Sequence, residues 1–548
     1  MRTTIYCTRF NKKCQSSNVD ETEPNEPCAN CVKLLTEILS EQFFSMNGPY
    51  RILTVLIALF LASFCYFYGA VRTREGSHYT GIRAINASDY NVNLSWIQQF
   101  REGHFLLKNL YSSEPHQGAL VRPVYWLVTM PFTRIFSNNT IVLHVSRIAC
   151  GAILLFALIP FFRTFGRDEK SSNLAAILLI FTSGAGILLH QWLPDSADLG
   201  LPEAILFLAL GEPPHFLYSL FLLWLGAAAL YKLPETKLRG LGVYLIALIL
   251  LWWEHPFDAV TLSAIAVASL WHQAGLRWRL IVLLMTLLAG LPSFLYYREL
   301  QTIPAFSGWA AQNVMLSPSP VSFLSAFFPL LLMAAPGSIS LWKNTESRRF
   351  FYFLTAWILV QSALIYGPFP YQRRLIAGLQ FPLALLAARG LLLLKGRLAL
   401  IIVVIFASTN VFVARQQVLP IRQGGMPYYL PDDYVKAFQW LASQEEKGVV
   451  LSGFVTGNFI PAYTGHAVYT GHSALTPDMR TKRKKAADFY VNPDHEFIRA
   501  NRIDYVFAGV EERHLTEGSS KISYPVVYRN KSIVVYQTGS GNPDSSGQ

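Results

Sequence analysis

The chain has 548 residues, of which 52% are hydrophobic and only 15% are charged, and its mean hydropathy is +0.31. This composition is too apolar for an ordinary water-soluble globular protein and predicts a membrane protein. The formal net charge of +12 is explained by basic loops beside membrane spans, so we expect no nucleic-acid partner.

The first 45 residues precede every long apolar segment and hold four of the six cysteines. Cys28 and Cys31 form a C-x-x-C pair, but with Cys7 and Cys14 the spacing matches no standard zinc site. We interpret residues 1–45 as a disordered cytoplasmic extension, with a zinc site as the alternative. Met46 begins a stretch that would itself suit the start of a membrane protein.

Apolar runs approaching the ~20 residues of a spanning helix recur up to residue 414. They predict about eleven spans in a transmembrane domain over residues 46–414, and are too long for the alternating strands of a barrel. The expected spans are 51–70, 140–162, 173–192, 214–231, 240–254, 257–273, 279–297, 320–342, 349–367, 374–394 and 398–414. The predicted fold class is therefore a polytopic α-helical membrane protein.

Lysine and arginine fall in alternate loops between these spans. The basic loops are 163–172, 232–239, 274–279, 343–349 and 395–397. The positive-inside bias assigns them to the cytoplasm, together with the N-terminus. The first loop, 71–139, and everything after residue 414 are then extracytoplasmic. We expect a multi-pass protein of the inner (plasma) membrane.

The long first loop has the pattern of interfacial structure. Residues after Asp89 read as a helix with Val92, Trp96 and Phe100 on one side, capped by Ser88 or Asp89. Residues 119–136 are apolar but interrupted by an arginine and two prolines, so we place them at the membrane interface.

Residues 415–540 predict a small extracytoplasmic α/β domain, followed by a tail at 541–548. The expected elements are a helix at 431–446, a strand at 447–453, a helix running into a strand at 497–509 and a hairpin at 524–537.

Candidate site residues gather in the outer loops. Asp89 is either a helix cap or a general base on an acceptor hydroxyl, and one carboxylate can serve both roles. Tyr90 and His104 lie in the same loop and are candidates for substrate binding.

The loop and returning helix at 194–221 form the second candidate region. Its titratable residues are Asp195, Asp198, Glu203, Glu212 and His215. A solvated acidic loop is the simpler interpretation. Two of the glutamates lie in apolar context, however, where an ionised carboxylate needs a partner or a task. The two aspartates have a spacing that suits a divalent ion only weakly.

Two further turns carry polar groups. His255 lies in a Glu-His-Pro turn that either breaks a helix or orients a substrate. Arg373 and Arg374 begin an outer helix, where a cation is unfavourable beside the helix dipole and wants an anionic partner. That partner is a lipid phosphate or diphosphate, or one of the acidic loops.

Residues 51–414 resemble the GT-C superfamily of integral-membrane glycosyltransferases, which includes protein mannosyltransferases and the aminoarabinose transferase of lipid A. The resemblance is carried by Asp89 in a long first outer loop, by the interfacial segment LVRPVYWLVTMPFTRIF, by a second span led by Arg147, and by Asp195 and Asp198. The motifs Pro202-Glu203, Pro214-His215-Phe216 and His255-Pro256-Phe257 add to it.

The resemblance implies transfer of a sugar from a polyprenyl-phosphate carrier to an envelope acceptor on the extracytoplasmic face. It implies Asp89 as the base and Arg373 or Arg374 as the ligand of the leaving lipid phosphate, with membrane lipid as a further partner. No D-x-D or E-x-D pair stands at Asp89, so we expect no cofactor and no metal is implied, although a divalent ion is compatible.

Two other functions fit a polytopic protein. A lipid-linked saccharide transporter or flippase is one, but polar groups crowd one face of this chain and no internal repeat is visible. A non-catalytic membrane scaffold with an outer binding domain is the other.

Overall fold

The computed structural model describes residues 49–539 except 166–167, 274, 395 and 516–521. The expected N-terminal extension with its four cysteines and the expected tail at 541–548 lie outside the described residues. Apart from one short strand, the described chain is helical as far as Gln423 and forms a small sheet region after it. The predicted fold class is therefore confirmed.

Eight helical segments among the described residues are long and apolar enough to cross a membrane. They are Pro49–Val71 (α3), Asn139–Phe165 (α6), Glu169–Leu189 (α7, Glu169–Phe181, with α8, Gly186–Leu189), Pro214–Thr236 (α11), Gly275–Leu300 (α14), Pro320–Lys343 (α16), Gln372–Leu391 (η3, Gln372–Ile376, with α18, Gln380–Leu391) and Ile401–Gln423 within α19, Gly396–Gln423. Each overlaps an expected span, and the chain is a multi-pass membrane protein.

The other three expected spans coincide with shorter apolar helices. These are α12 (Leu238–Glu254), α13 (Pro256–Ala268) and α17 (Arg348–Leu364), with 17, 13 and 17 residues. All fall short of the ~20 residues that cross a bilayer without tilt or thinning. The number of spans therefore stays a prediction.

Prolines define where several helices begin. Pro214, Pro256 and Pro320 stand in the first turn of α11, α13 and α16, where the missing N–H costs no helical hydrogen bond. Pro256 also separates α12 from α13, and His255 between them has a non-helical backbone with φ −141° and ψ 74°. This break leaves the His255 side chain at the end of the helix bundle.

Helices α16 and α18 approach through glycines. A Cβ on Gly337 would lie 2.0 Å from the carbonyl oxygen of Leu386, and one on Gly390 would lie 1.8 Å from that of Met333. Only glycine allows such close backbones, as at small-residue crossings of membrane helices.

Two of the expected basic loops, 232–239 and 343–349, contact each other. Arg349 pairs with Glu235 at 3.6 Å and donates to His272 at 3.0 Å, just before the expected loop at 274–279. Arg389 pairs with Asp168 at 3.6 Å at the same end. The short helices η1 (Leu270–His272) and η2 (Thr345–Ser347) belong to these turns.

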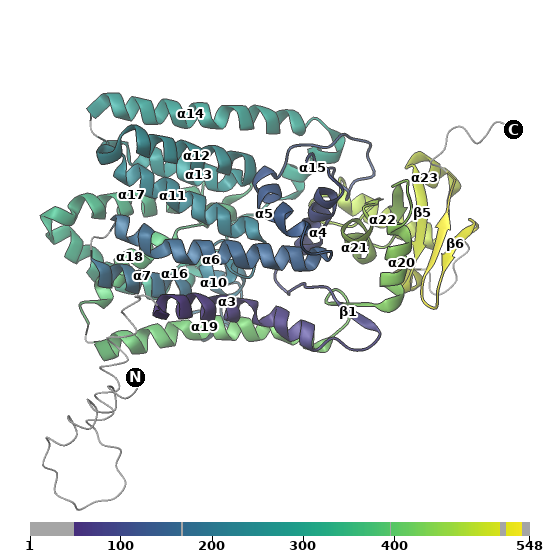
Figure 1. The fold of residues 1–548 in the computed structure, drawn as a ribbon, viewed down its shortest axis with the longest axis horizontal. Helices are drawn as coiled ribbons and strands as arrows, with labels where there is room; N and C mark the ends of the chain where they lie inside the picture. The colour runs from purple at the N-terminus through teal and green to yellow at the C-terminus, as the bar shows by residue number, and fades with distance from the viewer. Residues whose placement is uncertain (1–48, 166–167, 274, 395, 516–521, 540–548) are drawn as a thin grey trace, which may run out of the picture. The chain divides into compact units, whose positions relative to one another are not determined.

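Short elements cover the other end of the bundle, where α4, α5 and α15 lie between the long helices and α20 to α22 (Figure 1). These elements are β1 (Ser77–Tyr79), α4 (Ala87–Arg101), α5 (Pro123–Thr133), α9 (Ala197–Gly200), α10 (Leu206–Ala209) and α15 (Pro304–Gln312). With 11 residues, α5 is too short to span a bilayer, in line with the expected interfacial placement.

Helix α4 has the predicted apolar face but not the predicted cap. Val92, Trp96 and Phe100 are buried, as expected. The N-cap residue is Asn86, whose backbone lies in the left-handed region at φ 52°, and its side chain makes no capping hydrogen bond. The expected capping by Ser88 or Asp89 is wrong, because both residues lie inside the first turn and the Asp89 carboxylate is directed elsewhere.

The C-terminal region has a five-stranded sheet in the order β4-β3-β5-β7-β6. β3 pairs in parallel with β4 and β5, whereas β5–β7 and β7–β6 are antiparallel. Its elements are β2 (Tyr429–Pro431), α20 (Asp432–Ala442), β3 (Val449–Leu451), α21 (Phe454–Thr464), β4 (Ala467–Val468), α22 (Met479–Val491), α23 (His495–Ala500), β5 (Ile503–Ala508), α24 (Val510–Leu515), β6 (Val526–Arg529) and β7 (Val534–Gln537). The expected helix, strand, helix–strand unit and hairpin are all present.

This region contacts the loop at 71–139 at several places, two of which involve whole elements. β1 pairs antiparallel with β2, with Ser77 opposite Pro431, a contact that the sequence pattern does not predict. Helix α21 packs against α4, where Asn91 donates to Asn458 at 2.7 Å. These contacts position the C-terminal region over α4.

Candidate functional site

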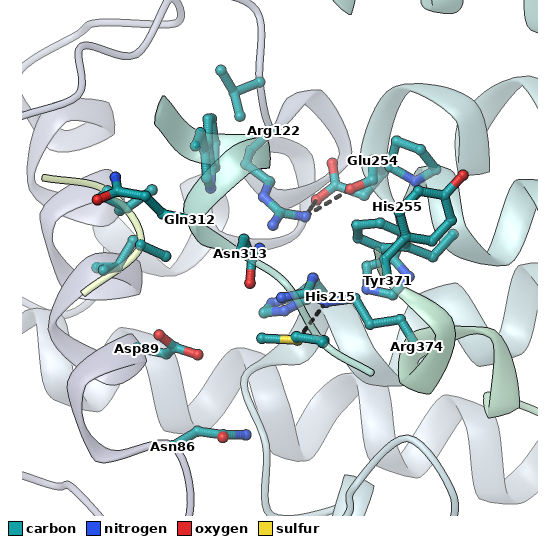
Figure 2. Close-up of a pocket in the computed structure, with 18 of the residues that line it drawn as sticks. Asn86, Asp89, Arg122, His215, Glu254, His255, Gln312, Asn313, Tyr371 and Arg374 are labelled. Carbon is teal, nitrogen blue, oxygen red and sulfur yellow. Dashed lines mark hydrogen bonds and ion pairs between the residues drawn. The ribbon is translucent and has the colours of Figure 1, made fainter. Parts of the chain in front are cut away.

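A cavity of about 760 Å³ opens where the short elements meet the C-terminal region. Its walls come from α4, from the segment before α11, from the α12–α13 turn, from the ends of α14 and α15, and from residues 370–374 and 472–475. Figure 2 shows Asn86 and Asp89 on one side of the cavity, with His255, Tyr371 and Arg374 on the opposite side. Seven of the predicted site residues line it: Asp89, Glu203, Glu212, His215, His255, Arg373 and Arg374.

One wall of the cavity is apolar and aromatic. Phe294, Tyr297 and Leu300 come from the last turns of α14, and Phe306 and Trp309 come from α15. Among the candidate spans, α14 is the helix least covered by the rest of the protein. This wall therefore lies where the bundle is least enclosed.

Asp89 presents a carboxylate to the cavity. Its side chain is 49% exposed, and Oδ1 accepts a hydrogen bond from Nε2 of His472 at 2.9 Å. Within the described chain, Oδ2 accepts no hydrogen bond, so one oxygen is held and the other is free for a ligand.

His472 follows strand β4 and its hydrogen bonds define its tautomer. Nδ1 accepts from the backbone N–H groups of Ala474 and Leu475, each at 3.2 Å. An acceptor nitrogen carries no proton, so in the neutral ring the proton is on Nε2 and is donated to Asp89.

The surroundings of Asp89 favour its ionised form. Burial in the cavity wall raises its pKa, whereas the hydrogen bond from His472 and the positive charges of Arg374 and Arg373 lower it. The net pKa of the Asp89 carboxyl is below its usual value. Asp89 is therefore a carboxylate at neutral pH, as a proton acceptor must be.

Arg373 and Arg374 have different partners although they are adjacent. Arg373 lies 3.7 Å from Glu203 Oε1, a side chain that is only 6% exposed. Arg374 stacks over the Phe257 ring at 4.7 Å and donates to the Met315 sulfur at 3.1 Å. In the part of the chain that the structure describes, no carboxylate pairs with Arg374. Arg374 is thus the cation with charge left for an anionic ligand.

Two histidines lie beside Arg374. The rings of His215 and His255 are 6.0 Å apart, and both side chains are more than 90% buried. His255 Nδ1 lies 3.1 Å from Asp258 Oδ2. His215 Nδ1 has no hydrogen-bond partner among the described residues, which leaves a buried polar atom at the cavity wall.

The other carboxylates of the cavity are tied to arginines. Glu212 pairs with Arg83, and both side chains are almost fully buried. Glu254 pairs with Arg122 at 3.3 Å and also accepts from the backbone of Val124. These pairs fix the cavity walls and leave Asp89 as the carboxylate with the most open oxygen.

Four predicted site residues lie away from the cavity lining. Tyr90 is fully buried and donates to the carbonyl oxygen of Gly211 at 2.6 Å. His104 and Asp195 are exposed elsewhere. Asp198 is buried and accepts from the backbone N–H of Gly186 at 2.9 Å, and burial raises its pKa. The structure therefore does not bring Asp195 and Asp198 together as a pair.

Sequence reasoning missed His472 and Arg122 as parts of the cavity. Arg122 stood out only as an interruption of an apolar segment, whereas Glu254 belongs to the Glu-His-Pro turn that the sequence did offer as a candidate. His472 carried no local signal, because it lies 383 positions from Asp89 in a segment with glycines and no known motif. Among the described residues no cluster of His, Cys, Asp and Glu has the geometry of a metal site.

Comparison with known proteins finds proteins with a similar fold but none with a similar sequence. No protein-family model matches the chain, and no curated protein is similar to it in sequence. Its fold is similar to that of ArnT from Cupriavidus metallidurans bound to undecaprenyl phosphate, with a TM-score of 0.52 and 12% identity over 91% of this chain and 100% of that one.

Apo ArnT from the same organism gives a TM-score of 0.50 and 13% identity over 89% of this chain and 98% of that one. The arabinofuranosyltransferase AftD from Mycobacteria gives 0.53 and 12% over 89% of this chain, but only 40% of AftD is covered. At such low identity these likenesses show a shared fold.

Proposed function

We propose that this chain, which has the GT-C fold, is a membrane glycosyltransferase that moves a sugar from a polyprenyl-phosphate carrier to an envelope acceptor. One observation carries the proposal: a single cavity holds a carboxylate with one free oxygen at Asp89 and, on its opposite side, an arginine without a carboxylate partner at Arg374. The solved structure of ArnT with undecaprenyl phosphate supports a lipid-phosphate donor by likeness of fold.

The reaction needs few protein groups. The free oxygen of Asp89 takes the proton of an acceptor hydroxyl while the hydroxyl oxygen of the acceptor attacks the anomeric carbon of the sugar. The bond from the anomeric carbon to the phosphate oxygen breaks, and the electron pair leaves with the lipid phosphate. Arg374 stabilises the charge that collects there, and the aromatic wall from α14 and α15 holds the first prenyl units. Attack from the side opposite the phosphate would invert the anomeric configuration.

The domain boundaries and the side of the membrane belong to this proposal. Residues 46–414 form the transmembrane domain, 415–540 the outer α/β domain, and 1–45 a cytoplasmic extension. The contact between the basic loops 232–239 and 343–349 supports a cytoplasmic assignment for that end of the bundle. The cavity at the other end then faces the extracytoplasmic side of the plasma membrane.

The test is transfer of radiolabelled sugar from polyprenyl-phosphate donors to endogenous membrane acceptors. Asp89→Asn should lower the rate by about 10²–10⁴-fold, the usual contribution of a general base, at unchanged membrane level. Asp195→Asn is the matched control, because Asp195 is exposed outside the cavity, and it should transfer like wild type.

Equal rates for Asp89→Asn and wild type would contradict Asp89 as the base and make Glu203 the next candidate. Absence of transfer by the wild-type chain from every donor would contradict the glycosyltransferase and favour the transporter or scaffold.

A further inference from the structure

We infer that His472, supplied by the C-terminal α/β region, is a positioning residue that holds Asp89 ionised and oriented, so that this region is an integral part of the active site. The expected effect on the transfer rate rests on the proposed function, whereas the expected effect on the pKa of Asp89 does not. It starts from a contact between a buried side chain and a half-exposed one: His472 is 5% exposed and Asp89 is 49% exposed.

Toward Asp89, the ring of His472 acts only as a hydrogen-bond donor, through Nε2. Because Nδ1 is occupied by the N–H groups of Ala474 and Leu475, it has no lone pair for a further proton. His472 therefore does not relay the proton of the reaction. It donates Nε2–H to one oxygen of Asp89, which leaves the other oxygen to accept the proton of a ligand hydroxyl.

His472 is itself held by a rigid turn. The Thr476 hydroxyl accepts from the backbone N–H groups of Gly471 and His472, at 3.2 and 3.1 Å. A Cβ on Gly471 would lie 2.4 Å from the carbonyl oxygen of Gly457 on α21, so the turn lies directly on that helix. The position of the ring is thus defined by the body of the C-terminal region.

The same region holds the helix that carries Asp89. Asn458 of α21 accepts from Asn91, and its amide also donates to the Ser88 carbonyl oxygen at 3.4 Å. Tyr111 donates to the carbonyl oxygen of Asn458 at 3.0 Å. Both partners of the Asp89–His472 bond are consequently fixed by one docked interface, which sets their distance.

The charged and titratable groups around Asp89 come from several elements. Arg373 and Arg374 act from the opposite wall, and Tyr111 lies beside the His472 ring at 5.6 Å between ring centres. The other charged and titratable groups that line the cavity are Arg122, Glu203, Glu212, Glu254, His215 and His255. Loss of the His472 donor leaves the two arginines as the remaining support for the carboxylate, so the pKa of Asp89 should rise.

The experiment compares three variants of the full-length protein. His472→Phe keeps the ring and its packing but removes the donor, and His472→Gln keeps a donor and an acceptor. His514→Gln is the control, because His514 is a histidine of the same region that is exposed on α24 and does not line the cavity.

Transfer is measured between pH 4 and 8. We expect His472→Phe to lower the transfer rate about 10²-fold, because a small misplacement of a catalytic group costs about that much. The acid limb of its pH–rate profile should move to higher pH. His472→Gln should recover most of the rate and keep the wild-type limb, and His514→Gln should match wild type in both. An unchanged rate and limb in His472→Phe would overturn the inference.

A second readout needs no turnover. Infrared titration of the carboxyl C=O band that disappears in Asp89→Asn reports protonation of Asp89 directly. The band should appear at higher pH in His472→Phe than in wild type, and an unmoved band would overturn the inference. If the band shifts but the wild-type protein transfers no sugar, the role of His472 in holding Asp89 ionised is upheld and only the proposed function is contradicted. His472→Ala replaces His472→Phe if the phenylalanine prevents accumulation.

Discussion

Arg122 and Glu254 form an ion pair that joins the start of α5 to the end of α12, with Nη1 and Oε1 3.3 Å apart and the glutamate fully buried. Glu254 also accepts from the backbone N–H groups of Val124 and Tyr125 and from the Tyr218 hydroxyl. Arg122 stacks over the Trp96 ring of α4 at 4.9 Å. One pair thus joins four helices around the cavity: α4, α5, α11 and α12.

Removal of Glu254 should destabilise the protein strongly. Glu254→Ala leaves Arg122 buried without its counter-ion and should lower the free energy of unfolding by about 3–5 kcal/mol. Denaturant unfolding in detergent measures the loss. Glu235→Ala is the control, because Glu235 is 52% exposed in its pairs with Lys232 and Arg349 and should cost less than about 1 kcal/mol. Similar losses for the two variants would contradict this assignment.

The two adjacent arginines should differ in their effect on donor binding. Arg374→Ala removes the cation that has no carboxylate partner, and kcat/KM for the lipid-phosphate donor should fall about 10- to 100-fold, the value of a charged hydrogen bond. Arg373→Ala should have a smaller effect, because Glu203 already balances part of that charge. Donor titrations of both variants measure this. A larger effect at Arg373 would reverse the assignment.

The contact between α16 and α18 should tolerate no side chain. Gly390→Ala would place a methyl group 1.8 Å from the carbonyl oxygen of Met333, so the two helices must separate and the yield of folded protein should fall. Gly242→Ala in α12 meets no atom within 4 Å and should be neutral or stabilising by up to about 1 kcal/mol. Size-exclusion profiles in detergent compare the two, and equal monodisperse yields would contradict the expectation.

The C-terminal region should weaken in acid through His466. Burial lowers its pKa from 6.5 to about 4, against opposing hydrogen bonds to the backbone. Because the folded state favours the neutral ring, the stability from this group is complete above pH 6.5 and is lost as the pH falls toward 4. The loss is at most about 3 kcal/mol.

The measurement is the thermal midpoint of the full chain in detergent between pH 7 and 4. His466→Gln should flatten the part of the acid decline that comes from this group. His514→Gln, at an exposed position of α24, should follow the wild-type curve. Parallel curves for all three proteins would show that His466 does not titrate in this range.

The sequence predicted those features that depend on neighbouring residues along the chain. A spanning helix is recognisable because its apolar length must match the bilayer, and α4 because its apolar residues repeat with the helical period. The helices and strands after residue 423 followed from equally local patterns. The cap of α4 was mispredicted, since Asp89 has the right residue type but is drawn to a partner outside the helix.

The cavity could be predicted only in part. Asp89, Glu203, His255 and Arg374 were identifiable as polar residues in unusual context, and the structure does bring them to one cavity. Their separate roles were not readable, because adjacent residues point in different directions: Asp89 faces the cavity while Tyr90 is buried against Gly211, and Arg373 meets Glu203 while Arg374 does not.

By itself the sequence determined that this protein is a polytopic membrane protein with acidic and basic residues collected in the loops between its apolar segments, because hydrophobic length and charge distribution are properties of the linear chain. Only the tertiary structure decided which carboxylate is open, which arginine is unpaired and which residue holds Asp89. The physical reason is that an ionised group in an apolar wall is stabilised by whatever donor folding brings beside it, and for Asp89 that donor, His472, comes from 383 positions along the chain.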